Sequence, residues 1–286
     1  MDRKARLTEI FRDTQVFYRK NAMLASAVQH STENTVFYPA EAYPAIKDRP
    51  AAAGLVTVSK RKTFEAAMQL NRENPNAKIA VLNFASATNP GGGVKHGSSA
   101  QEESLCRCST LFPTLDQQRL WDCYYLPNRA DANPLHTDAC IYSPGIVICK
   151  TDDDYPERLA DKDFVTVDVI TCAAPNLRRR PGNQYNPCDS DPVRIGAKDL
   201  FALHFRRAKH ILHIAAANET DILVLGAFGC GAFCNDPIIV ANAYADALKE
   251  YANCFQQIDF AIYCQDWKTE NYDAFKSVFG RTNSRE

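Results

Sequence analysis

Residues 89–103 read NPGGGVKHGSSAQEE and combine a flexible backbone with two adjacent acids. Three glycines allow the backbone to approach a ligand closely and allow several amides to point in one direction. Glu102 and Glu103 are neighbours, and a like charge raises the proton affinity of one carboxyl of such a pair. A carboxyl that is protonated near neutral pH can act as a general acid. The stretch therefore predicts acid–base chemistry on a ligand that the glycine loop holds.

A structural interpretation covers only part of this stretch. Ser99 and Glu102 have the S-x-x-E spacing of a capping box, which predicts a helix over residues 100–111. Glu102 would then bond back to the Ser99 amide, whereas Glu103 would have no structural role. We therefore expect Glu103 to perform the chemistry, and the amide of Gln101 to position a substrate or a carboxyl.

A second glycine loop, GAFGCGAFCNDP at residues 226–237, follows the apolar run DILVLG. Its glycines leave room for a ligand, and its final Asp-Pro predicts an N-cap and a first helical residue. A strand, a glycine loop and a helix N-terminus together suit a phosphate group. The spacing is neither a dinucleotide GxGxxG nor a P-loop. Because both glycine loops follow predicted strands, we expect them to lie along one edge of a sheet.

Short apolar runs alternate with helical patterns along the chain. This alternation predicts an α/β domain with a largely parallel or mixed sheet, and ligands of such sheets bind beyond the carboxyl ends of the strands. Apolar residues at helical spacing near the N-terminus predict an amphipathic helix that packs on the body. We expect a helical extension over residues 1–60, one compact unit over 61–286, and irregular stretches at 31–50, 126–139 and 175–192. The predicted strands are 78–84, 146–150, 164–171, 221–225 and 258–264, and the predicted helices are 63–70, 100–111, 193–217, 237–251 and 271–279.

The bulk composition excludes several classes of protein. The chain has 286 residues, a net charge of −1 and 45% hydrophobic residues, which is ordinary for a globular protein. This charge argues against a protein that coats nucleic acid or reads its sequence. No stretch reaches the ~20 apolar residues that span a membrane, and the first residues do not resemble a signal peptide. We expect a cytosolic protein, or a nuclear one in a eukaryote.

Eleven cysteines are scattered along the chain. Several lie in apolar runs, among them Cys149, Cys172 and Cys264, which favours buried, reduced thiols and a reducing compartment. The spacings of the cysteines and histidines match no zinc motif. We therefore expect neither a metal nor another cofactor.

The GGG and QEE motifs, Gly91–Gly93 and Gln101–Glu103, resemble the signature of poly(ADP-ribose) glycohydrolases. The loop GAFGCGAFCNDP resembles the diphosphate loop of macrodomains, and VLNFASATNPGGG and VDVITCAAPN resemble the microbial type of the glycohydrolase family. The resemblance extends from about Thr63 to Phe279. It implies a macrodomain-like mixed sheet between helices, with ADP-ribose across the strand ends, and hydrolysis of ribose–ribose O-glycosidic bonds in poly(ADP-ribose).

The resemblance also implies a role for each residue that matches a motif. Glu103 would be the catalytic acid/base that protonates the departing 2′-oxygen, and Glu102 would orient the ribose hydroxyls. An aromatic near the last strand, Tyr263 or Trp267, would pack on the substrate. The other substrate-binding residues would be Asn89, Gly91, Gly92, Gly93 and Gln101 on the distal ribose side, and Gly226, Gly229, Cys230, Gly231, Ala232 and Phe233 at the diphosphate.

Two other functions stay open at this point. A macrodomain that binds ADP-ribose without cleaving it would need only the two glycine loops, so the paired acids favour an enzyme. A hydrolase of mono-ADP-ribose on protein or nucleic acid would differ only in what fills the distal side of the cleft. The basic run Arg178–Arg180 is either solvated or a contact to polymer phosphates. We expect a monomer whose partners are poly(ADP-ribose), ADP-ribose and ADP-ribosylated proteins, in the reversal of ADP-ribosylation and the DNA damage response.

Overall fold

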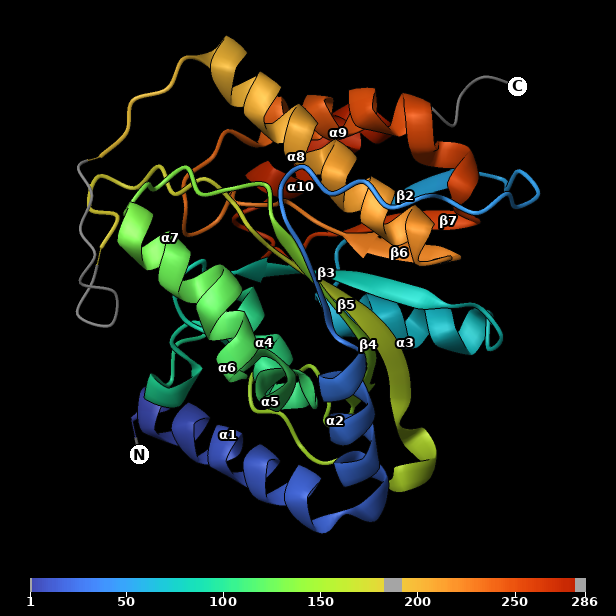
Figure 1. Ribbon diagram of the computed structural model, residues 1–286, viewed down its shortest axis with the longest axis vertical. Helices are drawn as coiled ribbons and strands as arrows, with labels where there is room; N and C mark the ends of the chain where they lie inside the picture. Colours follow the sequence, from blue (N-terminus) through green and yellow to red (C-terminus); the bar gives the residue numbers. More distant parts are fainter. Residues whose placement is uncertain (1, 183–191, 281–286) are drawn as a thin grey trace.

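A seven-stranded mixed sheet forms the centre of the protein (Figure 1). The computed structural model describes residues 2–182 and 192–280. The strand order is β1-β4-β5-β3-β6-β7-β2, and all neighbouring pairs are parallel except the two that β4 makes. The strands are β1 (Val36–Tyr38), β2 (Leu55–Ser59), β3 (Ile79–Ala85), β4 (Cys140–Ile148), β5 (Val165–Ala173), β6 (Ile222–Leu225) and β7 (Gln257–Ala261).

Helices cover both faces of the sheet. Helices α8, α9 and α10 lie on one face, and α3, α4 and α5 lie on the other, with α1 packed outside them (Figure 1). The helices are α1 (Arg3–Lys20), α2 (Ala22–Asn34), α3 (Thr63–Glu73), α4 (Gln101–Cys108), α5 (Leu111–Leu115), α6 (Gln118–Leu120), α7 (Leu126–Asp131), α8 (Ala197–Ala217), α9 (Pro237–Tyr251) and α10 (Glu270–Phe279). Short helical turns are η1 (Val94–His96), η2 (Trp121–Tyr125), η3 (Asp161–Asp163) and η4 (Ala252–Cys254).

The central strands are buried on both faces, which explains their continuous apolar runs. In β3, Ala80 and Leu82 join the core formed with α8 and α9, whereas Ile79 and Val81 join the core formed with α3 and α4. This alternation follows from the two-residue period of a strand. The predicted α/β fold with a mixed sheet between helices is confirmed.

The first 60 residues contribute both edges of the sheet as well as α1 and α2. Strand β1 pairs antiparallel with β4, and β2 pairs parallel with β7. The prediction of an irregular stretch over 31–50 is therefore wrong at the end of α2 and at β1, because a three-residue strand is too short to give a periodic pattern. The division of the chain at residue 60 stays a prediction.

Some predicted boundaries are also wrong. Strand β4 begins at Cys140, earlier than predicted, because the chain passes through Pro144 and Gly145 with a register shift instead of ending there. Strand β7 ends at Ala261, so Cys264 is only half-buried, whereas Cys149 and Cys172 are buried as expected.

The long helix begins at Ala197, later than the predicted residue 193, and α7 lies within the stretch 126–139 that we expected to be irregular. Part of the irregular stretch 175–192, residues 183–191, lies outside the described residues. Helix α9 has the predicted bounds, because Asp236 caps it through Ile238 and Ile239.

Helix α1 packs against the loop that connects the glycines to the acids. A side chain at Gly97 would collide with the backbone carbonyl of Lys4. Further along, the Thr14 hydroxyl donates to the carbonyl oxygen of Arg107 at 2.6 Å. The amphipathic N-terminal helix is thus confirmed, and it contacts both the loop before α4 and the last turn of α4. In the described part of the chain, no helix is long and apolar enough to cross a membrane.

Candidate active site

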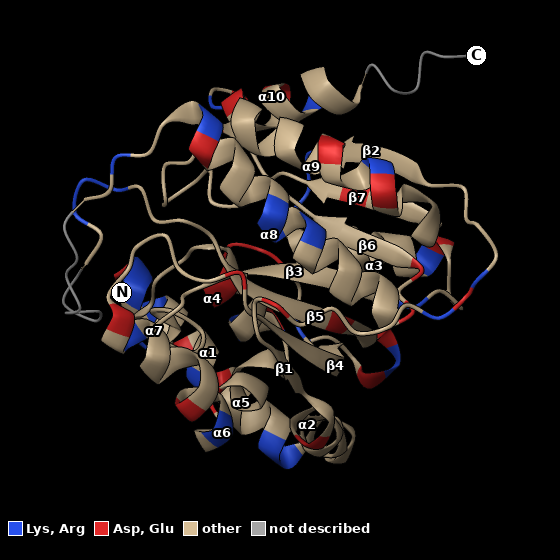
Figure 2. Cartoon of the chain, turned by 45° about the horizontal axis from the view of Figure 1, so that its top comes forward, with Lys and Arg blue, Asp and Glu red and all other residues tan. Residues whose placement is uncertain are grey.

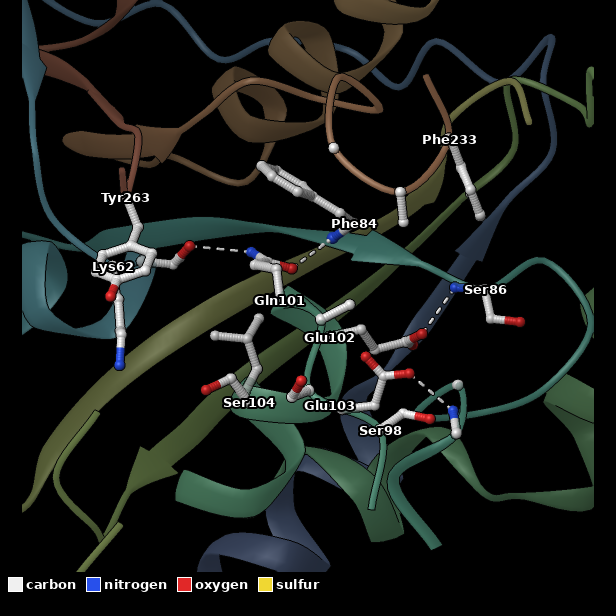
Figure 3. Close-up of a pocket in the computed structure, with 18 of the residues that line it drawn as sticks. Lys62, Phe84, Ser86, Ser98, Gln101, Glu102, Glu103, Ser104, Phe233 and Tyr263 are labelled. Atoms are coloured by element: carbon white, nitrogen blue, oxygen red, sulfur yellow. Dashed lines mark hydrogen bonds between the residues drawn. The ribbon is translucent and has the colours of Figure 1, made fainter. Parts of the chain in front are cut away.

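A cavity of about 730 Å³ opens where β3, β5, β6 and β7 end. Gly92 and Gly93 of the first glycine loop line it, and so do Gly229 and Gly231 of the second. The prediction that both loops lie along one edge of the sheet is confirmed. The acids Glu102 and Glu103 line the same cavity (Figure 3).

Glu103 is held by one carboxylate oxygen and not by the other. Its Oε1 accepts a hydrogen bond from the backbone N–H of Gly93 at 2.9 Å. Its Oε2 is buried and has no hydrogen-bond partner among the described residues. The side chain is 8% exposed. The sequence left Glu103 without a structural role, but the structure gives it one, since Gly93 orients its carboxyl group in the cavity.

Glu102 lies beside Glu103 and contacts the end of β3. Its Oε2 accepts from the backbone N–H of Ser86 at 2.7 Å, and its Oε1 accepts from Nδ2 of Asn83 at 3.3 Å (Figure 3). Burial, and then the charge of Glu103, raise the pKa of Glu102 to about 8, although these hydrogen bonds act to lower it. Glu102 is therefore mainly protonated at neutral pH.

The predicted capping box is wrong. Helix α4 begins at Gln101, its N-cap is Ala100, and no side chain caps it. The carboxyl of Glu102 points to the end of β3, so it does not return to the amide of Ser99. The helix also ends at Cys108, before the predicted residue 111.

The side-chain amide of Gln101 is bonded to the protein itself. Its oxygen accepts from the backbone N–H of Phe84 at 2.9 Å. Its nitrogen donates to the carbonyl of Leu82 at 2.8 Å and to the hydroxyl of Thr63 at 3.0 Å. Gln101 thus ties the first turn of α4 to β3 and α3, and so positions the two acids that follow it. A contact of Gln101 with substrate stays a prediction.

The first glycine loop makes room for the acids. Gly92 has φ of +55°, and a β-carbon there would lie 2.6 Å from Oε1 of Glu103. Gly91 does not line the cavity, since it faces Phe112 and Cys106. Asn89 lines the cavity, and its side-chain oxygen accepts from Arg129.

The second glycine loop presents unbonded amides to the cavity. Among the described residues, the backbone N–H groups of Gly231, Ala232 and Phe233 have no acceptor. A β-carbon on Gly231 would have no atom of the described chain within 4 Å. Such a row of free amides suits an anion. Gly226 and Cys230 do not line the cavity, because Gly226 faces the carbonyl of Ala261 and Cys230 packs on the core.

Asn235 holds the second loop in shape, a role that no pattern in the sequence indicates. Its Nδ2 donates to the carbonyls of Pro175 at 2.7 Å and Gly229 at 2.9 Å. Its Oδ1 lies 2.9 Å from Nε2 of His204 on α8. Burial lowers the pKa of His204 to about 4, so the ring is neutral and Nε2–H is the donor. The loop is therefore anchored to the segment that follows β5 and to α8.

Aromatic side chains lie at opposite ends of the cavity, Tyr263 at one end and Phe233 at the other (Figure 3). The ammonium of Lys62 lies 5.1 Å from the centroid of the Tyr263 ring. Trp267 is 78% exposed and is absent from the residues that line the cavity in the described part of the chain. Of the two aromatics that the sequence offered, Tyr263 is the one placed to contact a ligand.

The described histidines, cysteines and acids include no group of three or more that could hold a metal ion. Lysines and arginines alternate with acids over the helices, while loop segments that adjoin the grey trace are basic (Figure 2). Charge alone therefore does not mark the cavity, and its two glycine loops and its acid pair define it instead.

These features define an α/β protein of the macrodomain-like class with a pair of acids in its ligand cleft. The family model for the catalytic domain of microbial-type PARG, poly(ADP-ribose) glycohydrolase, matches residues 8–151. The chain belongs to this family.

Solved structures agree with this assignment. The poly(ADP-ribose) glycohydrolase of Thermomonospora curvata is 27% identical, with a TM-score of 0.79 over 96% of this chain and 99% of that chain. The same protein bound to the inhibitor ADP-HPD gives a TM-score of 0.76 over 95% and 98%. The enzyme of Deinococcus radiodurans in complex with ADP-ribose is 32% identical, with a TM-score of 0.74 over 89% and 97%. No curated protein sequence matches the chain.

Proposed function

We propose that the protein hydrolyses the ribose–ribose O-glycosidic bonds of poly(ADP-ribose) and releases ADP-ribose, with Glu103 as general acid/base. The observation that supports this most directly is the state of Glu103. One of its oxygens is fixed by Gly93, and the other is buried in the cavity without a partner among the described residues. An unpaired buried oxygen is costly, and a hydrogen bond to a substrate oxygen would explain its retention.

In this proposal ADP-ribose lies across the strand ends. The amides of Gly231, Ala232 and Phe233 bind the diphosphate, and the distal ribose lies against Gly92 and Glu103. The adenine extends to the opposite end of the cavity. The solved relatives bound to ADP-ribose and to ADP-HPD support this class of ligand.

The reaction then needs one proton-transferring group. Glu103 protonates the departing 2′-oxygen, the bond from that oxygen to the anomeric carbon breaks, and an oxocarbenium-like ribose forms. The negative diphosphate nearby stabilises this cation. Water attacks the anomeric carbon and gives its proton to Glu103, which restores the acid for the next cycle.

Glu102 supports this chemistry from the adjacent position. It holds a proton at neutral pH and orients the ribose hydroxyls. The two acids are consecutive residues on one helix turn, so they do not flank the sugar from opposite faces. The distance rule that separates retaining from inverting glycosidases therefore does not apply here.

Replacement of Glu103 by glutamine tests the proposal. Glutamine keeps the size and the contact to Gly93 but cannot transfer the proton, so we expect turnover of poly(ADP-ribose) to fall by ~10²–10⁴-fold with ADP-ribose binding retained. Glu73→Gln on the exposed side of α3 is the matched control, with unchanged turnover. Cleavage by Glu103→Gln at the rate of the unsubstituted protein would contradict the assignment.

Product analysis separates the other two functions. A macrodomain that only binds would retain ADP-ribose and release no product from polymer. A hydrolase specific for mono-ADP-ribose would release ADP-ribose from singly modified protein and leave the polymer length unchanged. Shortening of the polymer with release of ADP-ribose supports the proposed function.

A further inference from the structure

The loop that follows β5 forms a wall of the cavity against the diphosphate loop. A β-carbon on Gly229 would lie 2.7 Å from that of Ala174, which shows how closely the two loops pack. The backbone N–H of Leu177 donates to the carbonyl of Phe233 at 2.9 Å. The next residue, Arg178, lines the cavity beside Phe233. A fixed cation is thus placed at one end of the row of free amides.

The guanidinium of Arg178 is held in place by three contacts. Its Nε donates to Oδ1 of Asn176 at 3.0 Å, and its Nη2 donates to the carbonyl of Pro181 at 2.7 Å. It also lies 5.4 Å from the centroid of the Phe233 ring. Among the described residues no carboxylate pairs with it. Its charge is therefore not neutralised within the described part of the chain.

The neighbouring arginines differ from Arg178. Arg179 and Arg180 are exposed, and neither lines the cavity. The basic run thus divides into one half-buried arginine in the cleft wall and two on the surface. Arg179 and Arg180 offer a matched control, because they have the same charge as Arg178 and lie on the same loop.

Arg3, Arg61, Lys62 and Arg107 also line the cavity, and two of these cations are already engaged. Lys62 pairs with Asp154 at 3.1 Å, near Tyr263 at the far end. Arg107 is buried and donates to the carbonyl of Ser98. A diphosphate has two negative charges, and backbone amides supply only dipoles to balance them. Arg178 supplies a full charge at the diphosphate loop.

We infer that Arg178 binds a phosphate group of the substrate and makes the cleft selective for ligands that contain a pyrophosphate. The inference rests on the proposed function for the identity of the ligand. Guanidinium matches phosphate oxygens in geometry, and an arginine already fixed by Asn176 loses little conformational freedom when it binds. The phosphate belongs either to the ADP-ribose unit in the cavity or to the adjoining unit of the polymer, and the test distinguishes these sources.

The test compares Arg178→Gln and Arg178→Lys with the double variant Arg179→Gln/Arg180→Gln. The readouts are the dissociation constant of ADP-ribose, the KM for poly(ADP-ribose), and inhibition by adenosine, which has no phosphate. For Arg178→Gln we expect binding weakened by ~10–100-fold, as for loss of a charged hydrogen bond. We expect Arg178→Lys to restore part of this loss, since it keeps the charge, and the double variant to match the unsubstituted protein.

Each outcome has a defined meaning. Weaker binding of ADP-ribose by Arg178→Gln assigns the contact to the unit in the cavity. Unchanged ADP-ribose binding with a raised KM for polymer assigns it to the adjoining unit. The inference is overturned if Arg178→Gln changes neither ADP-ribose binding nor the KM for polymer. It is also overturned if the variant weakens inhibition by adenosine as much as it weakens binding of ADP-ribose. Failure of the unsubstituted protein to bind ADP-ribose overturns the proposed function, and the inference with it.

Discussion

Gly92 packs so closely against Glu103 that a β-carbon at position 92 would lie 2.6 Å from Oε1 of the acid. The same β-carbon would lie 3.1 Å from Oε2 of Glu102. With φ of +55°, Gly92 also has a conformation that other residues rarely adopt. The glycine loop and the acid pair are therefore one packed unit, and the glycine supplies the space that the carboxyl groups occupy.

Gly92→Ala should displace Glu103 and disturb the loop at the same time. A shift of the acid by about 1 Å lowers turnover by ~10²-fold, and the strained backbone lowers the free energy of unfolding by about 1–3 kcal/mol. Turnover of polymer and thermal unfolding measure the two effects. Gly196→Ala, before α8, is the control, because Asp199 at 3.8 Å is the only described residue within 4 Å of its β-carbon. Equal activity of the two variants would show that the contact at Gly92 is unimportant.

Glu102→Gln should change how stability depends on pH. The folded pKa of Glu102, about 8, lies above its ordinary value of 4.5, so the unfolded chain releases this proton first as the pH rises. The free energy of unfolding therefore falls as the pH rises from about 4.5 to about 8, by on the order of 1 kcal/mol per pH unit. Below about pH 4.5 Glu102 is protonated in both states and does not destabilise the fold. Glutamine resembles the protonated acid, so the variant should lose this dependence and be more stable at pH 7.

Denaturant unfolding of both proteins at pH 4, 6 and 8 measures this difference. The free energies of unfolding should coincide at the lowest pH and diverge as the pH rises. If the free energies of unfolding of the two proteins differ by the same amount at pH 4, 6 and 8, Glu102 ionises normally in the folded protein.

Patterns local in the chain predicted most of the fold. The apolar run of β3 and the Asp-Pro start of α9 both specify their elements from a few adjacent residues. The edge strand β1 has only three residues, and its partner lies about 100 residues away in β4, so no local pattern reveals it. The missed strands depend on pairing that forms only in the folded sheet.

The candidate site was predictable where one motif contained the residues. Glu102, Glu103 and the glycines came from two short loops. The partners of Glu102 were not predictable, because Asn83 lies within an apolar strand and contacts the acid only through the fold. The capping-box interpretation is wrong for the same reason, since the Glu102 carboxyl bonds Asn83 and Ser86 and no side chain caps α4.

Asn235→Ala should loosen the second glycine loop. The asparagine side chain donates to the carbonyls of Pro175 and Gly229. Its loss leaves the buried Pro175 carbonyl without this donor, while the backbone N–H of residue 235 still donates to the Gly229 carbonyl. We expect a loss of about 1–3 kcal/mol in unfolding free energy and a weaker affinity for ADP-ribose. Asn242→Ala on the exposed face of α9 is the control, with little change expected in either quantity. Full ADP-ribose affinity in Asn235→Ala would show that the loop keeps its shape without this clamp.

Arg206 and Arg207 both pair with Asp138, yet their replacement should have unequal effects. The side chain of Arg206 is 61% exposed, whereas that of Arg207 is fully buried and also donates to the carbonyls of Ala173, Leu135 and His136. Arg207→Met removes the donor of the buried Ala173 carbonyl and leaves the buried Asp138 without its buried cation. We therefore expect the free energy of unfolding to fall by about 3–5 kcal/mol. Arg206→Met removes an ion pair whose arginine is largely exposed. We therefore expect the free energy of unfolding to fall by at most about 1 kcal/mol.

Thermal and denaturant unfolding of the two methionine variants measures this contrast on one shared acid. The difference has a consequence for the cleft, because His136 lines the cavity and its carbonyl is held by Arg207. Arg207→Met should therefore also weaken ADP-ribose binding, while Arg206→Met should leave it unchanged. Equal stability of the two variants would mean that Asp138, and not the backbone carbonyls around Arg207, determines what this buried arginine contributes.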